Sequence, residues 1–520
     1  MRPGWVAWLL APLMVGAMAP PERVDLIIRG GTIYTGADAP FVGDVAVSGD
    51  RIRAVGPNLP HSAARIVEAR GMVVAPGFID PHTHAGTQLA SDDARTRLIR
   101  AFLMQGVTTA FIGNDGGGEP GVAAVLGRAR SRPVGINYAT FVGLGPVRTA
   151  TVGNVDRAPT AAELDRMRQM VASAMCEGAL GLSTGLFYAP QSFASIEEVT
   201  ALAREAGRRG GVYDSHIRDE SSYGIGLAAA IDEAIAIGRE AGLPVNISHI
   251  KARGVDVHGQ APAIIARIEA AQSSGQRVTA DQYPWSASGT TLVASLVPRW
   301  AQDGGRAAML RRFADPAAAS RIQLEMADNM RRRGGAASLL ITDGEHRGRT
   351  LADIARGWAA SDPVGAAMAI IRRGDPAVAS FNQTEEDIAA FMRRPWVMTS
   401  SDASTGHPRV YGSFARKYAE YVVARRVLSL REFIDRSTAL TADTFGIVDR
   451  GRLRPGAFAD IVVFDPDLYA ANATYERPTE LAAGVRAVIV NGVAAVENGA
   501  LTGAAAGRGL AHTPTPGTCS

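Results

Sequence analysis

The sequence contains little cysteine and little lysine. Cys176 and Cys519 are the only cysteines among 520 residues, so a framework of several disulfides does not hold this fold together. We expect Cys176, on a helical stretch, to be a buried structural thiol, and Cys519 to lie in a flexible tail over residues 506–520. The two lysines are Lys251 and Lys417. Any chemistry that requires a lysine must therefore use one of these two.

A strong excess of charge is also missing. The formal net charge is +3, which gives no reason to expect nucleic acid or a membrane surface as a partner. An apolar run lies within residues 1–19, where Arg2 precedes it and Ala17-Met18-Ala19 resembles a cleavage site. This run is short for a spanning helix, and no other segment is long enough. We expect a signal peptide over residues 1–19, export to the periplasm or the medium, and no membrane span in the mature protein.

The two ends of the chain share a β-like texture. Residues 24–74 alternate short apolar runs with Gly, Asn and Asp turns, and the same pattern returns at 460–464 and 485–492. A chain of 520 residues exceeds one ordinary core. We therefore predict a small β-sandwich built from residues 23–75 and 451–505, which brackets a central domain.

The central residues, 76–450, alternate apolar strand candidates with amphipathic helical stretches. This alternation predicts an α/β fold, a (β/α)₈ barrel. The gap between the seventh and eighth strands, 285–395, is too long for a loop and is predicted to contain an inserted subdomain. The strand candidates are 73–80, 107–113, 136–142, 179–183, 211–215, 244–248, 277–281 and 396–400.

Histidines and aspartates follow several of these strands. His82 and His84 are two residues apart, so in an extended backbone both imidazoles point to one face. The alternative is a purely structural role, in which the histidines pack in the core and the aspartates cap helices. That role would have to be invoked separately at five strand ends on one face of the barrel. Such a set suits Zn²⁺, which activates water and polarises a carbonyl, and a nearby aspartate can transfer a proton to a leaving amine. The predicted metal ligands are His82, His84, Asp115, His216, His249 and Asp402.

These motifs resemble the amidohydrolase superfamily and, within it, the N-acyl-D-amino-acid deacylase (D-aminoacylase) family. The resemblance extends from about residue 24 to residue 500. The motif at 77–84 is shared across the superfamily, whereas the run at 177–186 and His407-Pro408-Arg409 are closer to the deacylase branch. The stretches that carry the resemblance are 77–84, 177–186, 216–220, 281–284 and 407–409.

The resemblance implies a role for each matching residue. One metal position would take His82, His84 and Asp402, and the other would take His216 and His249, so that one or two Zn²⁺ ions are bound. Asp402 would also be the general acid and base. The residues that would hold the substrate carboxylate and the scissile carbonyl are Lys251, Tyr283 and Arg409.

The sequence departs from the family at the end of the second strand. The family has Gly-Asn-Cys-Gly there, with the cysteine as a metal ligand, and this chain has Asp115 in place of that cysteine. Other branches bridge two metals with a carboxylated lysine on the fourth strand, but residues 179–183 contain none. Asp115 is therefore the candidate bridging ligand; the alternative is that it only accepts backbone hydrogen bonds in its glycine loop. Leu144 replaces a usual histidine, and the loop 402–409 is shorter than usual.

The leading functional hypothesis is metal-dependent hydrolysis of the amide bond of N-acyl-D-amino acids or of small peptides that contain D-amino acids. A cyclic amide hydrolase and a dipeptidase for unusual peptide bonds are the enzymatic alternatives. A non-catalytic barrel is the third, and it predicts missing ligands, which the intact histidine set does not support.

Overall fold

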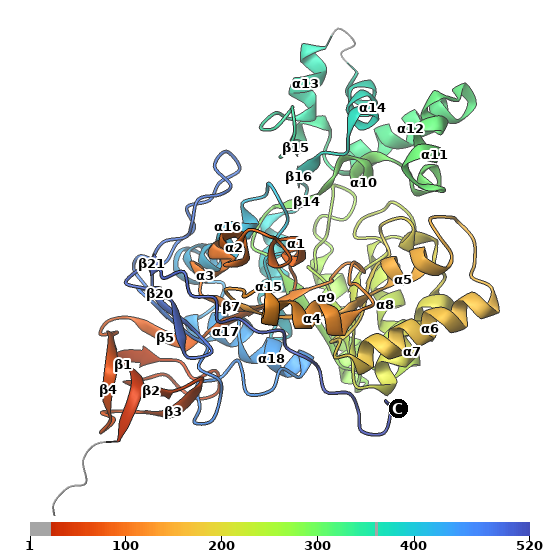
Figure 1. Ribbon diagram of the computed structural model, residues 1–520. Coiled ribbons are helices and arrows are strands. Elements are labelled where there is room, and N and C mark those ends of the chain that lie inside the picture. Colours follow the sequence, from red (N-terminus) through yellow and green to blue (C-terminus); the bar gives the residue numbers. More distant parts are fainter. Residues whose placement is uncertain (1–21, 359–361, 520) are drawn as a thin grey trace, which may run out of the picture.

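The computed structural model describes residues 22–358 and 362–519. The predicted signal peptide, residues 1–19, lies outside the described residues. Within the described ranges, no helix has the length and apolar character needed to cross a membrane. The molecule has a β-sandwich at one side, a barrel in the centre and an α-helical insert above the barrel (Figure 1).

Both ends of the chain build the sandwich. The N-terminal and C-terminal strands join where β5 and β18 pair antiparallel, with Val74 opposite Val463. The result is one continuous sheet in the order β21-β20-β19-β18-β5-β1-β2-β3, with β4 paired to β1. Its strands are β1 (Arg23–Ile33), β2 (Phe41–Ser48), β3 (Arg51–Gly56), β4 (Ser62–Glu68), β5 (Val73–Pro76), β18 (Ile461–Phe464), β19 (Val485–Val490), β20 (Val493–Glu497) and β21 (Ala500–Leu501).

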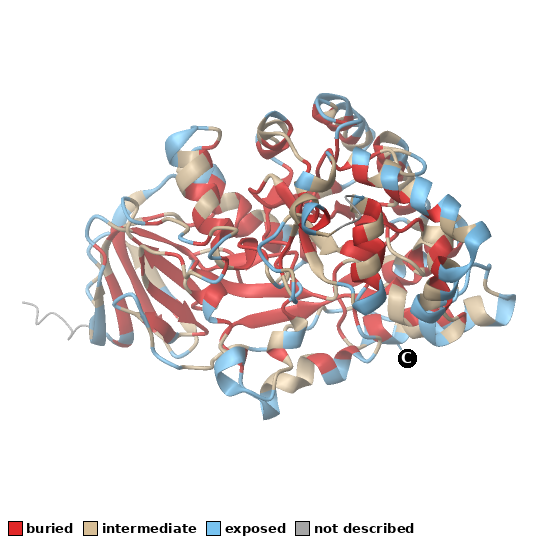
Figure 2. Ribbon diagram, turned by 90° about the horizontal axis from the view of Figure 1, so that it is seen from above, coloured by how far each residue is buried: buried red, intermediate tan, exposed pale blue. Residues whose placement is uncertain are grey.

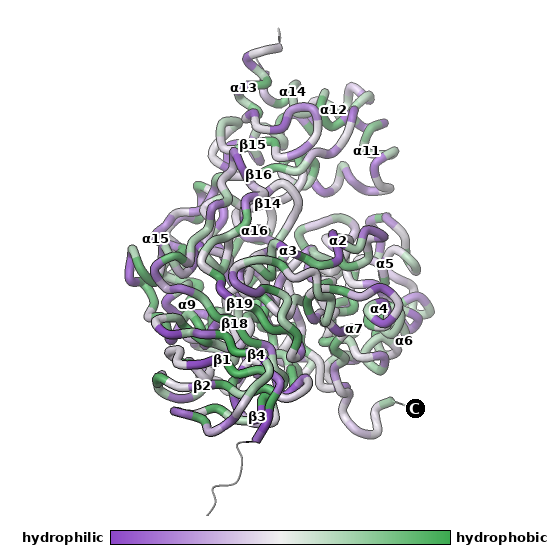
Figure 3. Tube along the Cα trace, turned by 60° about the vertical axis from the view of Figure 1, so that its left-hand side comes forward, coloured by the Kyte–Doolittle hydropathy of each residue, from purple (hydrophilic) through white to green (hydrophobic). Residues whose placement is uncertain are grey.

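The sheet packs around an apolar core, and its central strands β5 and β18 are buried on both faces. On β18, Ile461 and Val463 point into the sandwich core together with Ile28 and Val45 of the N-terminal strands. The alternate residue Val462 packs in the cluster shared with the barrel, as expected for a period of two along a strand. Figure 3 shows hydrophobic segments in the neighbouring strands β18 and β19 of this sheet, and β5 lies between β18 and β1. The shared apolar cluster fixes the sandwich against the barrel.

Eight parallel strands, one of them in two segments, form the barrel in the part of the chain that the structure describes, as the sequence predicted. They pair in the order β6-β7-β8 and β9-β10-β11-β12-β13-β17. β8 and β9 are consecutive pieces of one run, and a parallel bridge between Thr83 and Ala403 joins the first and last strands. The segments are β6 (Phe78–Asp80), β7 (Val107–Ile112), β8 (Asn137–Thr140), β9 (Val142–Gly143), β10 (Gly181–Gly185), β11 (Val212–His216), β12 (Val245–Ile247), β13 (Val278–Gln282) and β17 (Val397–Thr399).

Helices cover the outside of the barrel, with buried faces inward and exposed faces outward (Figure 2). Several of these helices have a capping side chain at the amino end. At the start of α6, for example, Thr160 and Glu163 each accept a hydrogen bond from the backbone N–H of the other. The helices are α1 (Gly86–Leu89), α2 (Ala94–Arg97), α3 (Arg100–Leu103), α4 (Val122–Ser131), α5 (Leu144–Thr151), α6 (Ala161–Cys176), α7 (Ile196–Arg208), α8 (Leu227–Ala241), α9 (Ala261–Ser273), α15 (Glu385–Met392), α16 (Arg409–Arg416), the π-helix Lys417–Ala424, α17 (Leu430–Arg436) and α18 (Ala439–Phe445).

An insert with its own core interrupts the barrel between β13 and β17. Leu296, Met326 and Ile354 are central to that core. Because β14 begins soon after β13, the insert stands over the carboxyl ends of the barrel strands (Figure 1). Its elements are β14 (Ala287–Thr291), α10 (Leu292–Leu296), α11 (Gly305–Ala314), α12 (Pro316–Arg332), β15 (Leu339–Ile341), α13 (Leu351–Gly357), α14 (Pro363–Arg373) and β16 (Ala377–Phe381).

The two cysteines form a disulfide, so the prediction that Cys176 is a free buried thiol was wrong. Cys176 ends α6 on the protein surface, where the exposed Cys519 reaches it. This is the one disulfide that two cysteines can form, so the stability of the rest of the fold depends on its apolar cores.

Residues 506–519, which the sequence predicted to be part of a flexible tail, are held against the barrel. Gly178 and Tyr138 hold the tail through backbone hydrogen bonds of 2.8–3.0 Å to residues 508–512. Gly509 makes the close approach possible, because a Cβ there would lie 2.2 Å from the carbonyl oxygen of Leu126. The tail therefore runs along the amino ends of the barrel strands, on the face opposite the strand ends that carry the predicted ligands.

Candidate metal centre and active site

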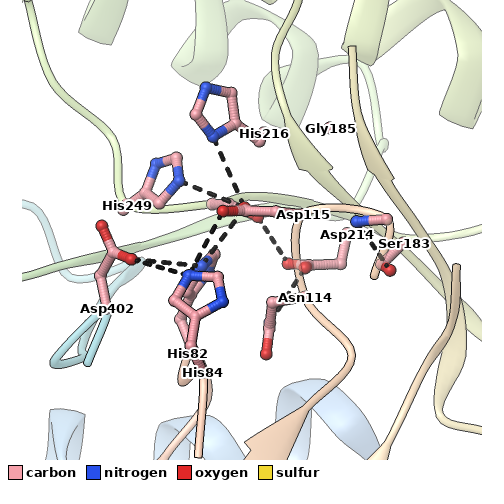
Figure 4. A network of polar contacts seen from close by, with 12 residues as sticks. His82, His84, Asn114, Asp115, Ser183, Gly185, Asp214, His216, His249 and Asp402 are labelled. Carbon is pink, nitrogen blue, oxygen red and sulfur yellow. Dashed lines mark hydrogen bonds and ion pairs between the residues drawn. The ribbon is translucent and has the colours of Figure 1, made fainter. Parts of the chain in front are cut away.

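The six side chains predicted as metal ligands converge at the carboxyl ends of the barrel strands (Figure 4). Strand pairing brings these ends together although the residues are far apart in the sequence. The active sites of this barrel architecture lie on that face. At the ends of β6, β7, β11, β12 and β17 lie, in chain order, His82 and His84, Asp115, His216, His249 and Asp402.

Asp115 is at the centre of the cluster. Its Oδ1 lies 3.3 Å from Nε2 of His82, 3.3 Å from Nε2 of His249 and 3.5 Å from Nδ1 of His216. Its Oδ2 lies 3.5 Å from Nε2 of His84. Burial alone would raise the pKa of Asp115, but the surrounding imidazoles hold it well below its usual range. One carboxylate therefore faces all four histidines.

The ligand atoms fall into two groups that share Asp115. One group consists of His82, His84, Asp115 and Asp402, and the other combines Asp115 with His216 and His249; within each group, the candidate ligand atoms lie within 4.8 Å of one another. A carboxylate has two oxygens and can contribute to two ions at once. The arrangement is that of two adjacent positions with Asp115 between them.

Three of these residues have an unusual backbone conformation. The φ values of Asp115, His249 and Asp402 are 55°, 37° and 48°, in the left-handed region that non-glycine residues adopt uncommonly. Such residues cost on the order of 1–3 kcal/mol each and cluster at functional sites. Backbone hydrogen bonds fix two of them, since His249 N–H donates to Asp281 at 3.0 Å and Asp402 N–H donates to the carbonyl of His82 at 2.9 Å.

The donor set fits a divalent metal ion. Both ring nitrogens of His82 and of His216, and Oδ1 of Asp115, are buried and have no hydrogen-bond partner among the described residues. Buried polar atoms in proteins are nearly always satisfied, and an exception calls for an explanation such as an ion. Imidazole nitrogens and carboxylate oxygens that converge on shared points are the ligands that Zn²⁺ takes.

Asp402 has a cationic partner. Nη1 of Arg409, the first residue of α16, lies 2.7 Å from its Oδ2, and its Oδ1 lies 3.2 Å from Nε2 of His84. Burial opposes ionisation, but Arg409 and the histidines outweigh it and hold the pKa of Asp402 below its usual range. Asp402 is therefore a carboxylate that can accept a proton.

A buried glutamate that sequence reasoning did not assign lies behind the histidines. Oε1 of Glu220 lies 2.5 Å from Nζ of Lys251 and 3.2 Å from Nδ1 of His249, and its Oε2 lies 3.6 Å from Nε2 of His216 and 3.3 Å from Nη1 of Arg253. Carboxylates in this position orient histidine ligands. The one sequence signal was its place four residues after His216.

The residues predicted to bind substrate are all close to the centre, but they differ in access. Lys251 lines a cleft of about 420 Å³ that also contains Asp402 and His249. Tyr283 and Arg409 are not among its lining residues. Tyr283 is almost fully buried, and its ring lies 5.5 Å from Nζ of Lys251 and 5.0 Å from the guanidinium of Arg409. The structure thus places one of the three at the cleft and two immediately behind it.

A buried hydrogen-bond network supports the ligands from below. Asn246 donates to Asp214 and to Asp281, both at 2.8 Å, and Asn114 donates to Asp214 at 3.1 Å. Asn114 precedes Asp115, and Asp281 also accepts the backbone N–H of His249. Because each acceptor and donor is matched, the strand ends are held in a fixed arrangement.

Comparison with known proteins places this geometry in a family. A family model described as "Amidohydrolase family" matches residues 65–496. The chain belongs to this amidohydrolase family. The resemblance inferred from the sequence motifs is therefore confirmed.

Three related proteins match most of this amidohydrolase. The D-aminoacylase of Alcaligenes xylosoxydans xylosoxydans is 34% identical over 95% of this chain and 98% of its own. The N-acyl-D-glutamate deacylase of the same organism is 34% identical over 91% of this chain and 94% of its own. The structure of an N-acyl-D-glutamate deacylase from Bordetella bronchiseptica, complexed with zinc and a phosphonate inhibitor, aligns with 94% of this chain and 100% of that chain (32% identity, TM-score 0.81). The predicted barrel with a β-sandwich is confirmed.

Proposed function

We propose that this amidohydrolase is a zinc-dependent enzyme that hydrolyses the amide bond of N-acyl-D-amino acids or of small peptides containing D-amino acids. The observation that carries the proposal is the convergence of four histidines on Asp115, beside a carboxylate paired with an arginine. The relatives described as D-aminoacylase and N-acyl-D-glutamate deacylase support the substrate class. A phosphonate inhibitor in the Bordetella bronchiseptica enzyme supports an acyl-transfer reaction with water.

His82, His84 and Asp402 would hold one Zn²⁺, His216 and His249 would hold a second, and Asp115 would contribute to both. When bound, zinc lowers the pKa of water to about 7 and polarises a carbonyl oxygen. The protein orients the metal-binding imidazoles, because Glu220 and the hydrogen-bond network around Asp214 hold them in place.

Asp402 moves the proton in this proposal. Arg409 keeps its carboxylate ionised, so Oδ1 can accept a proton from the attacking water and return it to the leaving amine. Lys251 faces the cleft and would orient the substrate carboxylate. Tyr283 and Arg409 would act from just behind it, through their contacts with Lys251 and Asp402.

Metal analysis of the purified protein, together with a panel of N-acetyl-D- and N-acetyl-L-amino acids, tests the function. We expect bound zinc, loss of activity after removal of the metal, and a preference for the D series. Full activity after exhaustive chelation, or hydrolysis of cyclic amides alone, would overturn the proposal.

We further propose that the protein is exported. The pattern of residues 1–19 supports this location, as does the surface disulfide between Cys176 and Cys519, because disulfides persist in oxidising compartments and are rare in the cytosol. Sequencing of the mature amino terminus from the native host should give a start near Pro20. An intact Met1 would contradict export by cleavage.

A further inference from the structure

Four arginine side chains surround the ring of Tyr223, where the barrel meets the insert. The guanidinium carbons lie 5.3 Å (Arg253), 5.7 Å (Arg299), 5.5 Å (Arg332) and 5.7 Å (Arg333) from the ring centroid. Like charges gathered so closely repel one another unless anions offset them.

Two of these arginines also share a second aromatic ring. Arg253 and Arg299 lie 4.3 Å and 4.1 Å from the centroid of Phe187. Arginine stacks on aromatic faces in this way while its N–H groups remain free to bind in the guanidinium plane. The rings therefore position the guanidiniums without consuming their hydrogen bonds.

Few carboxylates pair directly with the cluster. Asp219 acts on Arg299 and Arg253 without an ion-pair contact, and its oxygens accept backbone N–H groups instead. Glu220 pairs with Arg253 but also with Lys251, and Arg332 pairs with Asp328 at 2.6 Å. Arg299 and Arg333 have no carboxylate within ion-pair distance in the part of the chain that the structure describes. Burial lowers the pKa of Arg299 to about 10 and also lowers that of Arg333, which reflects the cost of holding these charges out of water.

Several donors of the cluster are unused. The buried atoms without a hydrogen-bond partner among the described residues include Nε and Nη2 of Arg253, Nη2 of Arg299, both terminal nitrogens of Arg333, and the hydroxyl of Tyr223. Arg253 is 2% exposed and Arg333 0%. Because buried charges are costly unless they are paired, unsatisfied donors on three arginines point to an anionic ligand.

The cluster adjoins the catalytic cleft. Arg253 lines that cleft, whereas Arg299 and Tyr223 line a side cavity of about 200 Å³. The cleft and the side cavity share Tyr188 and Thr291 as wall residues. A group bound among the arginines would therefore lie next to a substrate held at the metal centre.

We propose that Arg253, Arg299 and Arg333 form a binding site for a carboxylate or a similar oxyanion, separate from the residues that would hold the substrate's own α-carboxylate. The planar guanidinium matches a carboxylate with two parallel hydrogen bonds. The anion has two possible sources: the acidic side chain of the substrate, a version that rests on the proposed function, or a free oxyanion such as phosphate.

A pair of nearly isosteric substrates tests the first source. We expect N-acetyl-D-glutamate to be hydrolysed with a higher kcat/KM than N-acetyl-D-glutamine, which has the same shape without the charge. Arg299→Gln should reduce that ratio roughly ten-fold or more, since hydrogen bonds to charged groups are worth about 1.5–3 kcal/mol. Arg299→Lys should reduce it less. The matched control is Arg321→Gln, because Arg321 stacks on Trp300 at 4.2 Å on an exposed face of the insert.

Thermal unfolding with inorganic phosphate, at constant ionic strength, tests the second source. A site for free anions predicts that phosphate stabilises the wild type and Arg321→Gln but not Arg299→Gln, with the glutamate-to-glutamine ratio near one. If neither the substrate ratio nor the phosphate response depends on Arg299, the anion site is wrong even if N-acyl-D-amino acids are hydrolysed. If no such substrate is hydrolysed, the proposed function fails, and the phosphate response alone decides on the site.

Discussion

Nη1 of Arg409 lies 2.7 Å from Oδ2 of Asp402, and both side chains are buried. The pair joins the start of α16 to the end of the last barrel strand. It also assigns Arg409 a task that the motif alone did not suggest, because the guanidinium holds the proton-transfer carboxylate in its ionised form.

Removal of that cation should shift the pH dependence of the enzyme. In Arg409→Met the pKa of Asp402 rises, so the acidic limb of the pH profile of kcat/KM should move to higher pH and the maximum should fall. Arg416→Met is the control, because Arg416 lies on the same helix but stacks on Trp285 instead. An unchanged acidic limb would show that Arg409 acts only on the substrate.

The same variant should lose stability. Loss of one partner of a buried ion pair costs about 3–5 kcal/mol. The folded pKa of Asp402 is depressed, so the contribution of the pair is present above the unfolded carboxylate pKa of about 4 and is lost as the pH falls towards the folded value. Urea unfolding at pH 7 and at progressively lower pH should show the gap between wild type and Arg409→Met becoming smaller.

Asp115→Asn keeps the shape of the central ligand and removes its charge. We expect metal content and turnover to fall together, with metal affinity lower by roughly ten-fold or more, by analogy with the loss of supporting ligand contacts. Zinc per chain and kcat measured on the same sample provide the check. Asp92→Asn, an exposed aspartate, is the control. If Asp115 only accepted backbone hydrogen bonds, both quantities would remain near the wild-type values.

Glu220→Gln should weaken metal binding without removal of any predicted ligand. The carboxylate contacts Lys251 and His249, and its loss leaves the imidazole less firmly oriented. We expect a 10–100-fold loss of zinc affinity in competition with a chelator, the range known for such supporting contacts. Glu240→Gln, on the exposed surface of α8, should have no effect. Equal zinc affinity in both variants would assign Glu220 to the packing of Lys251 alone.

Reduction of the disulfide should lower the temperature of unfolding. The bridge closes a loop of 343 residues, for which the chain-entropy relation gives about 6 kcal/mol, although measured gains are often smaller. Calorimetry with and without a reductant should show a drop in the wild type. Cys519→Ser should unfold at the lower temperature and show no response to the reductant. An unchanged unfolding temperature in both would mean that the tail detaches before the barrel unfolds.

The barrel and its ligand set could be predicted because their determinants are local. The strand predicted at 107–113, for example, is a run of short apolar and β-branched residues and corresponds to β7, Val107–Ile112. His82 and His84 identified one strand end, and the barrel geometry implied that the other strand ends lie beside it. Pattern and topology together were sufficient to assemble the centre.

The position of the tail and the role of Glu220 could not be predicted, because both depend on contacts between residues that are distant in the sequence. Residues 506–519 are rich in small and polar side chains, and only their fit against Leu126 and Tyr138 shows that they are ordered. The role of Glu220 likewise depends on four side chains that meet it in space. The pairing of Cys176 with Cys519 requires the path of the tail, which no periodicity encodes.

The covalent link between Cys176 and Cys519 also changes what a protease can do. Most of the barrel and the whole insert lie inside the loop that the bridge closes. A single cut of the backbone anywhere in that loop leaves two fragments that remain joined through sulfur. A nicked molecule would therefore keep its full mass on a non-reducing gel and separate into two bands only when thiol is added.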